Sequence, residues 1–151
     1  MPTIRERLQD DWKNALKAKD KFKANVISTA KSAILLVQKQ DPSKEVTDDI
    51  VIEILAKEVK QRREAVLEFE KGNRQDLVES TNEEIKILLE YLPQQLSEEE
   101  IKQIIEDSAI EAGASSIKDM GKVMALVRPK TLGKADGKLV SQLVKEYLAN
   151  K

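Results

Sequence analysis

The stretch that decides the fold runs from Thr47 to Gly72 and reads TDDIVIEILAKEVKQRREAVLEFEKG. Its apolar residues recur at intervals of three and four, which places them on one face of a helix. Thr47 followed by two aspartates is typical of a helix N-terminus, and Gly72 is typical of a C-terminal stop. We therefore predict a helix through Lys71 that, at about 1.5 Å per residue, is roughly 36 Å long. The residues expected to face inward are Ile50, Ile54, Leu55, Val59, Val66 and Phe69.

The same kinds of signal predict helices on both sides of this stretch. The expected segments are 3–16, 21–39 and 74–91 in the first part of the chain, and 97–113, 116–129 and 136–148 in the last part. The spacing of a capping box occurs at Thr3 with Glu6, at Ser97 with Glu100 and at Ser116 with Asp119. The inward faces of the first two helices are expected to carry Ile4, Leu8, Trp12, Ala15, Leu16, Phe22, Val26, Ile27, Ala30, Ile34 and Val37.

No segment alternates apolar and polar residues over the length of a strand, so the predicted fold class is all-α. The pattern gives a four-helix N-terminal part followed by a three-helix C-terminal bundle. Pro93 is the best candidate for the boundary, which divides the chain into domains 1–93 and 94–151.

Composition excludes several classes of active site. The 151 residues include no His and no Cys, which removes serine–histidine triads, cysteine nucleophiles and ordinary zinc sites. The 27 acidic residues are too many for spacing to identify a catalytic pair, and Glu98–Glu100 suit the first turn of a helix. Ser115 and Ser116 near Lys118 could suggest serine–lysine catalysis, but helix capping is the better interpretation. We predict no catalytic residue, no metal site and no cofactor.

The chain also lacks an apolar segment that could enter a membrane. Its longest strongly apolar run, Ala33–Val37, is far shorter than the roughly 20 residues that span a bilayer. The first residues contain no apolar stretch suited to a signal peptide. Lys and Arg number 26 against 27 acids, a net charge of −1 that favours neither a nucleic-acid nor a membrane partner. The expected location is the cytoplasm.

Two basic clusters are the candidates for binding. Residues 118–151 contain eight basic and three acidic side chains, against one basic and six acidic in residues 94–117. The cluster in the basic segment surrounds a loop with glycines that would let a partner's backbone approach: Lys122, Arg128, Lys130, Lys134 and Lys138, with Gly121, Gly133 and Gly137. The secondary cluster, which a solvated helix face also explains, is Lys57, Lys60, Arg62, Arg63, Lys71 and Arg74.

Ordered motifs over nearly the whole chain resemble the YqeY family. They are EVKQRRE at 58–64, GNRQDLV at 72–78 and YLPQQLSEEE at 91–100. DMGKVM at 119–124, Pro129-Lys130 and GKADG at 133–137 resemble a tail that YqeY proteins share with the B subunit of the tRNA-dependent amidotransferase. The resemblance implies four helices followed by three, and a tail that grips tRNA. It carries no active site, because the amidotransferase chemistry belongs to parts that this chain lacks.

Three functions follow as hypotheses. The first is a helical accessory module that binds tRNA through the basic tail loop by phosphate and shape contacts. The second is an adaptor that binds a protein such as the amidotransferase or an aminoacyl-tRNA synthetase. The third, implied only by the family resemblance, is a carbon–nitrogen ligase that uses glutamine as amido-N-donor. The lack of His and Cys argues against independent catalysis.

Gly121 stands inside a helical pattern, where glycine is about 1 kcal/mol less favourable than alanine. Two explanations are open. In the first, the last helix packs closely against this position near Val140 or Leu143, and a side chain would not fit. In the second, a ligand approaches the backbone closely at this position.

Overall fold

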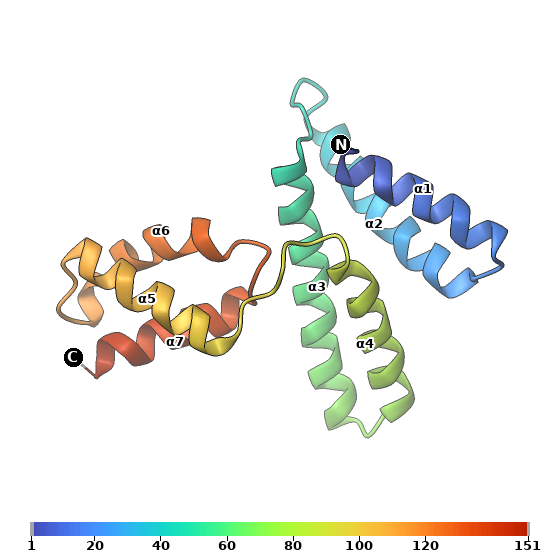
Figure 1. Cartoon of the computed structure of the whole chain (residues 1–151). Helices are drawn as coiled ribbons and strands as arrows, with labels where there is room; N and C mark the ends of the chain where they lie inside the picture. Colours follow the sequence, from blue (N-terminus) through green and yellow to red (C-terminus); the bar gives the residue numbers. More distant parts are fainter. Residues whose placement is uncertain (1, 151) are drawn as a thin grey trace. The chain divides into compact units, whose positions relative to one another are not determined.

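The computed structural model describes residues 2–150, and all regular elements within them are helical. The predicted all-α class is thus confirmed. The chain divides between Leu92 and Pro93 into two compact units, each with its own apolar core. Among the described residues, four α-helices lie in the first unit, and three α-helices with one short 3-10 helix lie in the second (Figure 1).

The first unit consists of two helical hairpins. Helices α1 (Ile4–Lys17) and α2 (Lys21–Gln40) form one hairpin, and α3 (Asp48–Lys71) and α4 (Gln75–Leu89) form the other (Figure 1). Helix α3 begins and ends as predicted, with the Thr47 hydroxyl accepting the Ile50 N–H at its start. The largest fully buried side chains of this unit are Leu8, Ile27, Val51, Leu55 and Leu88.

Polar contacts join elements of the first unit that are far apart in sequence. Asp48, the first residue of α3, accepts the otherwise unpaired N–H of Ile4 at 3.1 Å. The Tyr91 side chain is buried after the end of α4, and its hydroxyl donates to the Asp11 carboxylate of α1. The Arg7 guanidinium lies over the Tyr91 ring, 5.2 Å from its centroid.

The sole tryptophan of the chain also lies in the first unit. Trp12 of α1 is half-buried, and the Lys31 ammonium of α2 lies 4.1 Å from its ring centroid. The pair therefore connects the two helices of the first hairpin through a cation–π contact.

The second unit contains α5 (Glu98–Ala112), the 3-10 helix η1 (Ile117–Asp119), α6 (Met120–Thr131) and α7 (Gly137–Ala149). The predicted caps form: Ser97 and Glu100 make a complete capping box on α5, and Ser116 and Asp119 make one on η1. The core of this unit is built from Ile101, Ile105, Val123, Val127, Val140, Val144 and Leu148.

Several details of the predicted helices are wrong. Helix α6 continues past Pro129 to Thr131. It can do so because the missing proline N–H leaves only the Ala125 carbonyl without its helical donor, and this exposed residue can use water instead. The fourth helix ends at Leu89 and not at Tyr91. Leu16 and Phe22, expected on the inward faces, are 49% and 41% exposed because they flank the turn between α1 and α2.

The Tyr91 hydroxyl gives a prediction about stability. Tyr91→Phe removes the hydrogen bond to Asp11, and we expect it to lower the free energy of unfolding by about 1–2 kcal/mol at neutral pH. Burial, followed by the Asp11 hydrogen bond, raises the pKa of Tyr91 above its ordinary value. The folded protein therefore keeps a proton that the unfolded chain loses above pH ~10, so wild-type stability falls as pH rises beyond that point.

The difference in unfolding free energy between wild type and Tyr91→Phe should thus shrink above pH ~10, by up to ~1.4 kcal/mol per pH unit. Urea denaturation followed by circular dichroism at a series of pH values measures it. Lysines also titrate in this range, but both proteins carry the same ones, so their contribution cancels in the difference. A difference that stayed constant with pH would show that Tyr91 is not held in its protonated form by folding.

Candidate nucleic-acid interface

The structure gathers most of the basic tail cluster at the connection between α6 and α7. Arg128 and Lys130 lie in the last turn of α6, Lys134 lies in the loop, and Lys138 lies in the first turn of α7. We call Arg128, Lys134 and Lys138, with the loop 132–136 between them, the basic loop. Lys122 does not belong to it, because it lies near the start of α6, six residues or about 9 Å of helix before Arg128.

Hydrogen bonds from the segment before α5 hold the backbone of the basic loop. The Gln95 side-chain amide donates to the Gly133 carbonyl at 2.7 Å, and the Leu96 N–H donates to the Lys134 carbonyl at 2.8 Å. On the other side of the loop, the Thr131 carbonyl accepts the N–H of Lys134 at 2.9 Å. Gly133 is buried with φ of 74°, a backbone conformation that glycine adopts without strain.

Gln95 and Leu96 were not among the predicted site residues. The sequence singles out residues 91–100 as a family-like motif, but no periodicity connects this motif to a loop almost forty positions later. The structure supplies the connection, and it makes Gln95 and Leu96 positioning residues for the basic loop.

The three cations of the basic loop form no ion pairs with other described residues. Among the ion pairs of residues 2–150, none involves Arg128, Lys134 or Lys138. Lys130 differs, because its ammonium lies 3.8 Å from the Glu111 carboxylate and 3.4 Å from the Ser108 hydroxyl on α5. The structure therefore turns Lys130 onto α5 and leaves three cations available to an anionic partner.

The start of α7 carries opposite charges, those of Lys138 and Asp136. Lys138 lies in the first turn of α7, at the positive end of the helix dipole, where a cation lowers helix stability. The first turn contains no acidic side chain, although the Asp136 carboxylate caps the helix by accepting the Lys138 N–H at 3.2 Å. The placement of Lys138 is thus unfavourable for the helix alone and adds a cation to the loop, whereas the Asp136 carboxylate reduces the attraction of this helix start for an anion.

The secondary basic cluster is divided by the structure. Lys71 pairs with Glu68 at 3.4 Å, and Arg74 pairs with Asp76 at 3.1 Å. The hydrogen bond between Arg74 and Asp76 raises the pKa of the guanidinium and lowers the pKa of the carboxyl group. Lys57, Lys60 and Arg63 remain on α3 without an ion pair among residues 2–150.

Arg62 points into the first unit. Its side chain is only 15% exposed and lies 3.3 Å from the Glu58 carboxylate and 3.5 Å from that of Glu84 on α4. It also donates to the Thr29 hydroxyl of α2 at 3.3 Å. Arg62 therefore joins three helices and is not placed to bind a partner.

The glycines of the tail differ in environment. A β-carbon built on Gly121 or on Gly137 would meet no atom within 4 Å. The expectation that Gly121 packs closely against α7 is therefore wrong: Gly121 is the second residue of α6 and is exposed there. Gly133 is the glycine of the cluster whose backbone conformation requires it.

Ser115 and Ser116 act in helix capping. The Ser116 hydroxyl accepts the Lys118 N–H, and the Asp119 carboxylate accepts the N–H groups of Ser115 and Ser116. The hydrogen bond from the Ser115 N–H, followed by that from the Ser116 N–H, holds the pKa of Asp119 below its ordinary value.

Within residues 2–150 no three acidic side chains come together in a way that could hold a metal ion. No helix in the same range is long and apolar enough to cross a bilayer.

Comparison with known proteins places the whole chain in one family. The family model described as Yqey-like protein matches residues 5–148. A protein of Pyrenophora tritici-repentis named altered inheritance of mitochondria protein 41, mitochondrial, is 30% identical over 149 residues, which cover 96% of this chain and 81% of that protein. A Kluyveromyces lactis protein of the same name is 34% identical over 84 residues, which cover 56% of this chain and 45% of that protein.

Two glycine substitutions test the geometry of the basic loop. Gly133→Ala places a β-carbon in the left-handed region, and we expect it to lower the free energy of unfolding by about 1–2 kcal/mol. Gly121→Ala is the matched control, because its β-carbon enters open space in a helix; stability should stay the same or rise by up to about 1 kcal/mol. Thermal unfolding measures both. Equal destabilisation by the two variants would contradict the backbone described for Gly133.

Proposed function

We propose that this protein, which belongs to the YqeY-like family, is a helical accessory module that binds folded RNA of the tRNA class through its basic loop. The observation that carries the proposal is the combination of three cations that have no ion-pair partner among residues 2–150 and a loop backbone held by Gln95 and Leu96. A loop that is ordered before binding loses little conformational entropy when phosphates reach it.

The composition of the loop favours contacts with the RNA backbone. Residues 128–138 include no aromatic side chain on which an unpaired base could stack, so phosphate and shape contacts are the expected mode. Leu132 and Leu139 are 45% and 36% exposed beside the cations and offer apolar contact to ribose or to a base edge. The resemblance of residues 119–137 to the amidotransferase tail supports tRNA as the RNA class.

The decisive experiment measures tRNA binding over a range of salt concentrations. Each phosphate contact contributes about 0.7–0.9 to the slope of log affinity against log salt. The triple variant Arg128→Ala, Lys134→Ala, Lys138→Ala should bind more weakly, and its slope should be shallower by roughly 2–3 than that of the wild type.

The control removes the same number of charges elsewhere. Lys39, Lys118 and Lys145 are exposed and take part in no ion pair among residues 2–150, so their alanine variant tests for a general effect of charge. It should keep the wild-type slope. Salt-independent binding, or equal losses in both variants, would contradict the proposal. If tRNA does not bind but a synthetase or amidotransferase co-purifies after nuclease treatment, the chain is an adaptor and the RNA assignment fails.

A further inference from the structure

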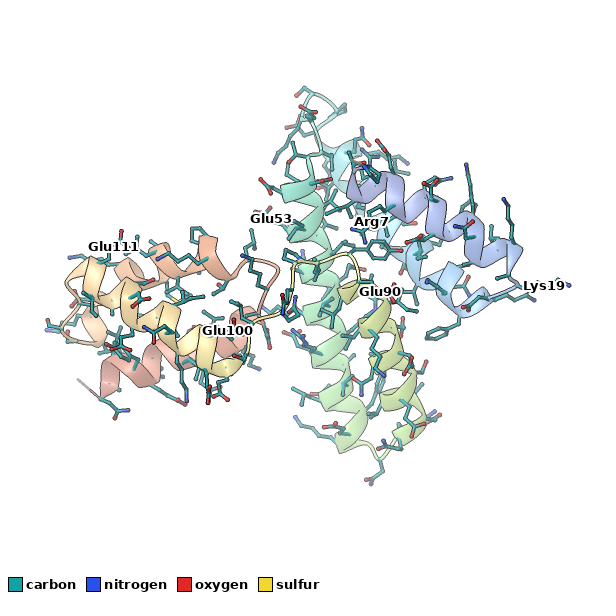
Figure 2. All side chains as sticks on the ribbon, in the orientation of Figure 1. Arg7, Lys19, Glu53, Glu90, Glu100 and Glu111 are labelled. Atoms are coloured by element: carbon teal, nitrogen blue, oxygen red, sulfur yellow. The ribbon has the colours of Figure 1, made fainter. Side chains whose placement is uncertain are left out.

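A further concentration of positive charge lies at the turn between α1 and α2. Residues 13–21 contain four lysines and one acidic residue, a net charge of +3 in a chain whose total is −1. We call Lys13, Lys17, Lys19 and Lys21 the lysine tip. Figure 2 shows Lys19 at the outer end of the hairpin, with its side chain extending away from the helices.

The lysines of the tip form no ion pairs in the part of the chain that the structure describes. No ion pair among residues 2–150 involves any of its four lysines. The one acidic residue of the segment, Asp20, uses its carboxylate to cap α2 by accepting the Lys23 N–H at 3.1 Å. The local charge is therefore exposed to solvent and to any partner.

Helix stability explains Lys17, which lies in the last turn of α1 at the negative end of the helix dipole, but it does not explain Lys19 or Lys21. Lys21 lies in the first turn of α2, which contains no acidic side chain and is the positive end of the helix dipole. Lys19 has φ of 61°, a left-handed conformation that glycine adopts more readily than a residue with a β-carbon. Both positions are unfavourable for the helices, although the N–H groups of Lys19 and Asp20 cap α1 by donating to the Leu16 and Ala15 carbonyls at 3.1 and 2.8 Å.

An exposed apolar side chain lies beside the lysines. Leu16 is in the last turn of α1, between Lys13 and Lys17, and is 49% exposed. Phe22 is also exposed, but it lines an open cleft with Asp76, Glu79 and Glu83 of α4, and these acids would repel an anionic surface. The apolar contribution of the tip therefore comes from Leu16.

We propose that the lysine tip binds an anionic lipid surface, with its lysines at the headgroups and Leu16 at the boundary with the acyl chains. This partner goes beyond the proposed RNA function and differs from the expectation of no membrane partner. All four cations are lysines, hydrated point charges without the fork geometry by which arginine recognises nucleic-acid phosphates. Clusters of four or more basic residues beside an exposed apolar side chain are typical of attachment to anionic membranes.

Flotation of the full chain with lipid vesicles tests the proposal. The protein should float with vesicles of phosphatidylcholine that contain about a third phosphatidylglycerol. With vesicles of pure phosphatidylcholine it should remain in the bottom fraction of the gradient. Lys17→Ala, Lys19→Ala, Lys21→Ala should weaken binding by about a hundredfold, and Leu16→Ala by several-fold. The control Lys57→Ala, Lys60→Ala, Arg63→Ala removes three unpaired cations from α3 and should retain most of the wild-type binding.

A single substitution separates lipid binding from folding. Lys19→Gly removes one charge and relieves the left-handed strain, so we expect a higher melting temperature together with about fivefold weaker vesicle binding. If Lys19→Gly instead lowers both the melting temperature and vesicle binding, Lys19 has a structural role and the proposal is wrong.

The remaining outcomes distinguish other partners. If the wild-type protein does not bind anionic vesicles, the lipid assignment is wrong. The lipid assignment is also wrong if a tip variant loses tRNA binding but keeps vesicle binding, because the tip would then be an RNA-binding surface. Failure of tRNA binding alone leaves the lipid result unaffected, because the basic-loop variant and the tip variant are measured separately against each ligand.

Discussion

Burial of the apolar stripe of α3 is the constraint on which the first unit depends. Val51, Leu55, Val59 and Val66 lie on one face of this helix and are almost completely removed from water. Each such side chain contributes on the order of 1.5–3 kcal/mol when fully buried. Because a helix of this length cannot bury its stripe alone, α4 lies along it and the α1–α2 hairpin covers the rest (Figure 1). The second unit buries the apolar faces of its helices in a separate core.

Much of this fold could be predicted from the sequence because its signals are local. Caps such as Ser97 with Glu100, and stops such as Gly72, involve residues within one or two turns of each other. Periodicity also finds the stripe of α3, although Val51 and not Ile50 is the fully buried residue at its start. It failed at Leu16 and Phe22, because a helical pattern does not reveal that residues beside the turn between α1 and α2 are exposed.

The candidate sites were less accessible to sequence reasoning. Counting charges located the basic loop, but only the structure separates Arg128, Lys134 and Lys138 from Lys130, which is turned toward Glu111. The bond from Gln95 to the Gly133 carbonyl joins a side chain to a distant backbone atom, and such bonds follow no residue pattern. The lysine tip was missed for another reason. A net charge near zero conceals opposite charges that are concentrated in different places, and the surface potential depends on where the charges lie.

The pairing of Trp12 with Lys31 has a spectroscopic consequence. As the sole tryptophan of the chain, Trp12 places the entire indole emission in the first unit. Its fluorescence during denaturation follows the first core alone, whereas the far-ultraviolet signal sums the helices of both cores. The two optical traces, recorded on one sample, resolve the melting of the first unit from that of the second without cutting the chain.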